Sequence, residues 1–138
     1  MTGLKPAGAR IGERFDTLTM PRRVALEVIS RYQWLRPHPV GAAVARALTD
    51  EWVLILPPGS GYGMAWSFPA DHRAEGVLEV PPLAAGPDDD LRWARKGNDA
   101  GRVFSAPFLL MFALRSARAA CPPHLVPVRD DRLPVGIR

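Results

Sequence analysis

The sequence contains little cysteine, little lysine and no long apolar run. The shortage of cysteine and the absence of a long apolar run each exclude a class of structure. The single cysteine, Cys121, cannot form a disulfide within the chain or build a cysteine-based zinc site. The longest apolar stretch, residues 108–114, is far shorter than the roughly 20 residues that a membrane-spanning helix requires. The N-terminus lacks the apolar core of a secretory signal. We therefore expect a cytoplasmic protein with no membrane partner.

Arginine supplies nearly all of the positive charge. Basic residues outnumber acidic ones by 18 to 14, which gives a net charge of +4, and all but Lys5 and Lys96 are arginine. Arginine pairs with phosphate through two parallel hydrogen bonds, so this composition permits a nucleic-acid partner. A GC-rich coding sequence enriches arginine as well, so the composition alone does not demand one.

The length and apolar content predict one folded domain. Apolar residues make up 47% of 138 positions, which is enough for a hydrophobic core. Residues 1–10 are rich in glycine, proline and alanine, and we expect them to be disordered. Residues 11–121 form the predicted domain, and 122–138 are predicted to be an irregular, proline-rich tail.

The first half of the domain predicts a strand, a helix and a hairpin. A strand is expected over 14–18, followed by a helix over 21–34 that begins at Pro21, because proline is favoured at the first helical position. The apolar run 52–56 predicts a strand, and the tight turn before it makes 42–48 its hairpin partner.

The second half predicts further strands and a closing helix. Strands are expected over 64–68, 77–80 and 91–93, with a polar turn at 71–73. Ser105 is predicted to cap the last helix. The residues expected on the buried side of that helix are Phe108, Leu109, Met111, Phe112 and Ala119. This order predicts a two-layer α+β domain, with helices on one face of a mostly antiparallel sheet.

Three local features are candidates for function. The loop that begins at Pro57 ends a strand abruptly, and strand ends are common positions for binding sites. Asp71 and His72 are adjacent and could form an acid/base pair, although a histidine in a surface turn is the more common case. The stretch Arg92, Trp93, Arg95 and Lys96 combines cations with a stacking ring, so it is the candidate nucleic-acid-binding strip.

The order of several short motifs resembles a known family. The motifs are Phe15-Asp16 before a proline-started helix, Pro39-Val40, residues 52–56 followed by Pro58-Gly59, Val80-Pro81-Pro82, and Leu91-Arg92-Trp93 before a closing helix. Over roughly residues 10–120 they resemble the N-terminal domain of the bifunctional DNA primase/polymerase (prim-pol) family. The resemblance is to its short, divergent actinobacterial members.

The resemblance implies a two-layer α+β nucleotidyltransferase core. Active members use paired acidic residues at a strand end, a histidine on the following hairpin and a further acidic residue, and they hold two divalent metals. Asp16 matches the first acidic position, whereas Leu18 stands at the second. No histidine lies among residues 54–56. Asp16 is therefore a vestigial catalytic residue, no metal site is expected, and Mg²⁺ or Mn²⁺ would be a cofactor only if polymerase activity were retained.

Three interpretations stay open at this point. The leading one is a degenerate, non-catalytic prim-pol-like domain that binds single-stranded nucleic acid or nucleotide. The second is a small regulatory module that binds a protein partner, and the third is an active primase/polymerase fragment. Basic residues gathered on one face would favour the first, and a contiguous exposed apolar patch would favour the second.

Overall fold

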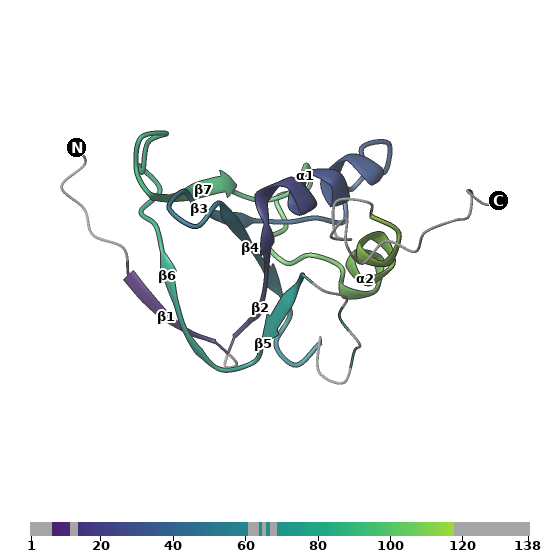
Figure 1. The fold of residues 1–138 in the computed structure, drawn as a ribbon, viewed down its shortest axis with the longest axis horizontal. Helices are drawn as coiled ribbons and strands as arrows, with labels where there is room; N and C mark the ends of the chain where they lie inside the picture. The colour runs from purple at the N-terminus through teal and green to yellow at the C-terminus, as the bar shows by residue number, and fades with distance from the viewer. Residues whose placement is uncertain (1–6, 12–13, 61–63, 65, 67–68, 118–138) are drawn as a thin grey trace, which may run out of the picture.

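The protein has an α+β fold in which two helices pack against one face of an antiparallel sheet (Figure 1). The computed structural model describes residues 7–11, 14–60, 64, 66 and 69–117. Within these residues a five-stranded sheet and a two-stranded ribbon are both antiparallel. The predicted fold class is therefore confirmed. None of the helices in these described segments is long and apolar enough to cross a membrane.

The centre of the sheet is a split β-α-β unit. Strand β2 (Asp16–Pro21) leads into helix α1 (Arg22–Arg31), which is followed by β3 (Ala43–Arg46) and β4 (Glu51–Leu56). Strand β4 pairs antiparallel with both β2 and β3, so it lies between two strands that run in the same direction. Helix α1 makes the crossover between those two strands.

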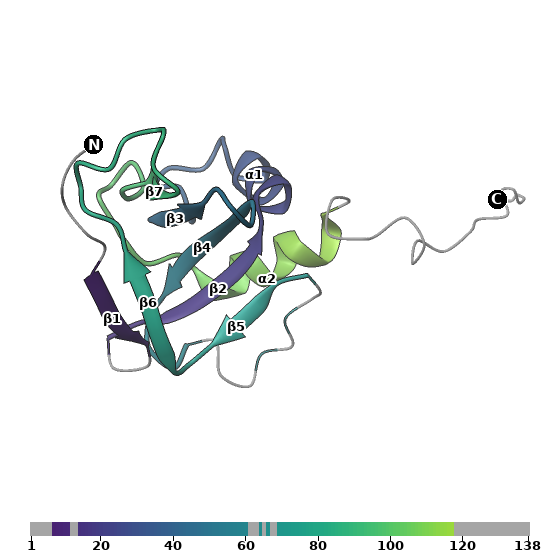
Figure 2. The same cartoon turned by 60° about the vertical axis from the view of Figure 1, so that its left-hand side comes forward.

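Shorter strands complete the sheet at both edges. Strand β5 (Asp71–Arg73) pairs with β2, and β7 (Leu91–Arg95) pairs with β3, which gives the order β5-β2-β4-β3-β7. A separate ribbon joins β1 (Ala7–Ile11) to β6 (Gly76–Val80). Figures 1 and 2 show this ribbon on the side of the sheet that faces away from α2 (Pro107–Ser116).

Both faces of the sheet are covered, and alternate residues of β4 pack into the core on one face and on the other. Leu54 and Leu56 point into the main core beneath α1 and α2. Val53 and Ile55 point into a smaller cluster that contains Leu78 of β6. Because side chains alternate along a strand, a strand buried on both faces must be a continuous apolar run. The run Trp52–Leu56 is such a sequence.

Local sequence explains how α1 begins and where it packs. Pro21, with φ −57°, occupies the N-cap position, and Val24, Ala25 and Val28 form the buried stripe of the helix. The Tyr32 hydroxyl, just beyond α1, donates to the backbone oxygen of Leu109 at 2.5 Å. Burial raises the pKa of this phenol, against an opposing effect of Arg31. This contact ties α2 to the end of α1.

The structure differs from the sequence predictions at several positions. Residues 7–10 were expected to be disordered, but they belong to β1. Residues 71–73 were expected to turn, but they pair with β2 as edge strand β5. Ser105 does not cap α2, because its hydroxyl instead accepts the backbone N–H of Gly41 at 2.9 Å. The strand predicted over 64–68 falls largely outside the described residues, and the tail at 122–138 falls wholly outside them.

Helix α2 buries a different side from the predicted one. Leu110, Ala113 and Leu114 face the core, whereas the side chains of Phe108 and Phe112 are 67% and 58% exposed. Leu109 is 37% exposed, and Met111 is partly buried. Ala119 lies outside the described residues. The helix therefore presents an outward apolar face, which we call the α2 face and define by Phe108 and Phe112.

Candidate functional site

The first residue of β2, Asp16, is completely buried at one end of the sheet. It pairs with Leu56, the last residue of β4, and lies on the same face of β2 as Leu18 and Met20. The two residues that share its face belong to the main apolar core. A carboxylate in such surroundings is costly unless its oxygens are hydrogen-bonded or neutralised.

Two donors converge on one oxygen of this carboxylate. The Nε2 atom of His72 lies 3.0 Å from Oδ2 of Asp16, and the backbone N–H of Gly59 donates to the same oxygen at 3.2 Å. His72 comes from β5, opposite Leu18, so the pairing of β5 with β2 brings its ring to Asp16. Gly59 comes from the loop after β4 and has a positive φ of 74°, which glycine adopts without strain. We call Asp16 and His72 the dyad.

The hydrogen bonds define how the dyad can act. An ionised Asp16 can only accept, so Nε2 of His72 is then the donor, and in the neutral form of the ring Nδ1 is an acceptor. The ring of Trp66 stacks on the imidazole, with centroids 6.1 Å apart and an angle of 24° between the planes. A buried carboxylate that orients an imidazole is the arrangement used by general bases and by metal-bound histidines. Asp16 is thus placed to position His72.

The dyad does not fit the two-metal site of the prim-pol family. Oδ2 of Asp16 already accepts two hydrogen bonds, and Leu18, at the second acidic position, is fully buried in apolar surroundings. Among the described residues, no group of three or more His, Cys, Asp or Glu side chains could hold a metal ion. Oδ1 of Asp16 is also buried, and it has no hydrogen-bond partner in that part of the chain. Asp16 and Leu18 therefore cannot supply the pair of ligands that two-metal chemistry requires.

The structure does not gather the candidate nucleic-acid strip on one surface. Neighbouring residues of a strand point to opposite faces, and Arg92 and Trp93 are neighbours in β7. Trp93 packs against the cluster beneath the ribbon and donates from Nε1 to the backbone oxygen of Pro81 at 3.0 Å. Arg92 lies on the opposite face of β7. The ring and the cation are thus separated by the sheet.

The other two residues of the strip also differ in their surroundings. Arg95 donates to the backbone oxygens of Gly41 and Val40 at 3.2 and 3.1 Å, so it holds the segment that precedes β3. Burial lowers the pKa of this guanidinium, while the nearby Asp99 opposes the shift. Lys96 is exposed beyond the end of β7. Arg95 therefore has a structural partner, whereas Lys96 remains accessible to a ligand.

Arg92 instead joins two other arginines around a small hollow. The hollow has a volume of about 220 Å³ and is lined by Arg22 of α1, Arg46 of β3, Arg92 and the turn residue Asp50. Arg22 pairs with Asp50 at 2.8 Å, and Arg46 lies 3.9 Å from Glu51. Arg92 has no hydrogen-bond or ion-pair partner among the described residues. We call Arg22, Arg46 and Arg92 the arginine cluster. By strand alternation Arg46 shares a face with Val44 and also lines a second hollow beside β6, so its side chain starts on the side of the sheet opposite to Arg92.

Sequence reasoning missed both the dyad and the arginine cluster. His72 was considered with its neighbour Asp71, yet Asp71 pairs with Arg73 at 3.0 Å while His72 reaches Asp16, 56 positions away in the sequence. The polar residue at the start of an apolar strand was the available signal for Asp16. Comparison with protein-family models, curated proteins and solved structures gives no match.

Proposed function

We propose that this protein is a prim-pol-like domain without polymerase chemistry that binds single-stranded nucleic acid or nucleotide. The observation that carries the proposal is the dyad. It combines Asp16, which starts β2 and stands at the family's first acidic position, with His72 of the edge strand β5. The split β-α-β sheet is consistent with the two-layer core that the resemblance implies. The net charge of +4 and the arginine cluster supply phosphate-binding chemistry.

The absence of polymerase chemistry is argued from Leu18 and from the burial of Asp16. A two-metal mechanism requires carboxylates that bridge ions accessible to the triphosphate. Asp16 is 0% exposed and Leu18 cannot coordinate a metal. The dyad would then serve to fix the loop at Gly59 and the ring of His72, at the end of β2 opposite to the arginine cluster.

We expect the purified protein neither to extend a primer nor to synthesise one in the presence of Mg²⁺ or Mn²⁺. Gel analysis of labelled primer–template with all four deoxynucleotides measures this directly. The matched control is Asp16→Ala, which removes the carboxylate. Metal-dependent nucleotide incorporation that disappears in Asp16→Ala would show that the third interpretation, an active polymerase, is correct.

We expect measurable affinity for single-stranded DNA or RNA that falls steeply with added salt, because phosphate contacts release counterions. Fluorescence anisotropy with a labelled oligonucleotide, starting at about 50 mM salt, measures both affinity and salt slope. Replacing Arg46 and Arg92 by glutamine should weaken binding. It should also reduce the slope by about 0.7 for each phosphate that the variant no longer neutralises.

A matched control separates the arginine cluster from net charge. Arg115 is exposed in the last turn of α2, so Arg115→Gln removes a charge outside the cluster and should leave the slope closer to that of the unmodified protein. Equal losses from Arg92→Gln and Arg115→Gln would reject the arginine cluster as the contact site. No binding to either nucleic acid at about 50 mM salt would reject the proposed function itself.

The α2 face favours a second candidate function, a module that binds a protein partner. Phe108 and Phe112 lie one helical turn apart and are both more than half exposed. Neighbouring exposed aromatics are typical of protein-interaction surfaces. This candidate takes precedence if the anisotropy experiment detects no nucleic-acid binding.

A further inference from the structure

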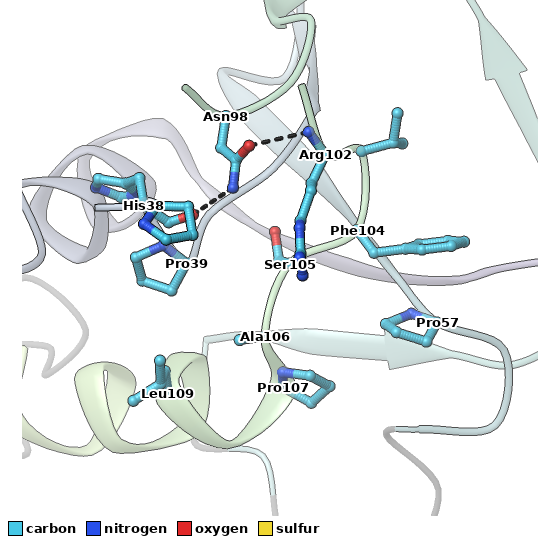
Figure 3. Close-up of a pocket in the computed structure, with 12 residues that line it drawn as sticks. His38, Pro39, Pro57, Asn98, Arg102, Phe104, Ser105, Ala106, Pro107 and Leu109 are labelled. Atoms are coloured by element: carbon cyan, nitrogen blue, oxygen red, sulfur yellow. Dashed lines mark hydrogen bonds between the residues drawn. The ribbon is translucent and has the colours of Figure 1, made fainter. Parts of the chain in front are cut away.

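A cavity of about 620 Å³ lies between residues 37–39, segment 98–106 and the start of α2 (Figure 3). Its volume falls within the range of roughly 300–1,000 Å³ that is usual for small-molecule sites. The described residues that line it include neither the dyad nor the arginine cluster. The cavity is therefore separate from the features on which the proposed function rests.

The walls of the cavity are held by the backbone. The N–H of Ser105 donates to Ile55, and the N–H of Ala106 donates to Pro39, at 2.8 and 2.9 Å. Gly41 packs so closely on this segment that an added Cβ would overlap the backbone oxygen of Val103. Four prolines add rigid apolar surface: Pro37, Pro39, Pro57 and Pro107. A preformed cavity of this kind binds a ligand with little cost of ordering.

Two polar side chains of the lining already have hydrogen-bond partners within the protein. His38 donates from Nε2 to the oxygen of Ile29 at 2.9 Å and accepts the N–H of Val40 at Nδ1, which fixes its neutral tautomer. The Asn98 amide donates to the oxygen of His38, and its own oxygen accepts the backbone N–H of Arg102 (Figure 3). These groups shape the cavity and leave little capacity for a ligand.

Two polar side chains of the described lining can still donate a hydrogen bond. Ser105 is 2% exposed and its hydroxyl accepts the Gly41 N–H, and no acceptor for the hydroxyl proton lies among the described residues. The Arg102 guanidinium has no partner in that same part of the chain, and its side chain runs from the Asn98 turn toward α2 in Figure 3. None of the described residues that line the cavity carries a carboxylate.

The start of α2 adds to this donor character. Within the described residues the helix has no side-chain cap and no acidic residue in its first turn, and Pro107 and Leu109 from that turn line the cavity. The positive end of a helix dipole favours an anion. Apolar walls on the remaining sides, including Phe104, suit the body of the same ligand.

We propose that this cavity binds a small aromatic carboxylate, with its ring against the proline and Phe104 walls and its carboxylate at Arg102 and Ser105. Charge complementarity determines this choice, because the two lining side chains that can still donate include the cationic Arg102 and the described lining carries no carboxylate. The site is independent of the nucleic-acid proposal and can stand or fall without it.

Isothermal titration of the full chain with 2-naphthoate, and with the neutral naphthalene-2-carboxamide as matched ligand, tests the proposal. We expect 2-naphthoate to bind about tenfold more tightly, since a charge-assisted hydrogen bond is the stronger kind. Arg102→Gln should abolish most of that preference. Arg23→Gln, which removes an exposed arginine of α1, should retain it. Leu109→Trp should weaken both ligands by filling the cavity.

Any of four results would overturn the proposal. Equal affinity for the two ligands, or no binding of either, would show that the cavity does not recognise an anion. An unchanged preference in Arg102→Gln would place the anion elsewhere; Arg102 is exposed, so this variant should fold. Undiminished binding in Leu109→Trp would assign the ligand to another surface, such as the α2 face.

Discussion

Replacing Leu54 by alanine is expected to lower the free energy of unfolding by about 2–5 kcal/mol, and Ile55→Ala by a similar amount. Leu54 is 0% exposed in the main core beneath the helices. Ile55 is 5% exposed in the cluster beneath the ribbon. Both faces of the sheet are covered, so water barely reaches the side chain of either Leu54 or Ile55. Each truncation therefore leaves a cavity.

Urea unfolding followed by circular dichroism measures both losses. Leu48→Ala is the matched control, since this leucine lies in the turn before β4 with 86% of its surface exposed, and its replacement should change stability by less than about 0.5 kcal/mol. If Ile55→Ala matched Leu48→Ala while Leu54→Ala was costly, the ribbon would not cover the sheet in solution. If both core variants matched Leu48→Ala, β4 itself would be misassigned.

The elements that sequence predicted are those whose pattern is decided locally. The run Trp52–Leu56 is apolar at every position, and the structure places it in the strand Glu51–Leu56. The stripe of Val24, Ala25 and Val28 predicts α1, and the structure confirms the helix over Arg22–Arg31. Such patterns identify an element because the spacing of the apolar residues along the chain is enough to show which of them are buried.

The elements that sequence missed depend on distant partners. Strand β5 is only Asp71–Arg73, polar and at an edge, so only its pairing with β2 makes it a strand. Strand β1 likewise depends on β6 for its hydrogen bonds. In α2 the run 108–114 is apolar on every side, and periodicity cannot choose which side is buried. The prediction that Phe108 and Phe112 are buried was wrong for this reason.

The candidate site also depends on contacts between residues that are distant in the sequence. Strand alternation alone predicts that Arg92 and Trp93 point to opposite faces once 91–93 is taken as a strand, so the separation of ring and cation was predictable. The pairing of Asp16 with His72 was not, because it requires the register of β5 on β2. No local pattern in the sequence encodes that register.

Removing the carboxylate of Asp16 is expected to cost about 1–3 kcal/mol for each buried donor left without an acceptor. Of the two described donors to it, Nε2–H of His72 is mostly buried, whereas Gly59 is exposed and its N–H can bond to water instead. His72→Phe keeps an aromatic ring for Trp66 to stack on, but it leaves the buried Asp16 carboxylate with only the N–H of Gly59, so its cost should be at least as large. Asp71→Ala is the matched control, because Asp71 adjoins His72 but is exposed, and its carboxylate pairs with Arg73.

A double-mutant cycle distinguishes a coupled dyad from two independent residues. The variant carrying both Asp16→Ala and His72→Phe should lose less stability than the sum of the single losses, with a coupling of about 0.5–3 kcal/mol. Imidazole ¹⁵N spectra supply a second readout that packing alone would not change. In the unmodified protein the neutral ring of His72 should carry its proton on Nε2, and in Asp16→Ala that preference should be lost. Additive losses, or a tautomer unchanged by Asp16→Ala, would show that Asp16 does not orient His72, and the dyad would no longer support the proposed function.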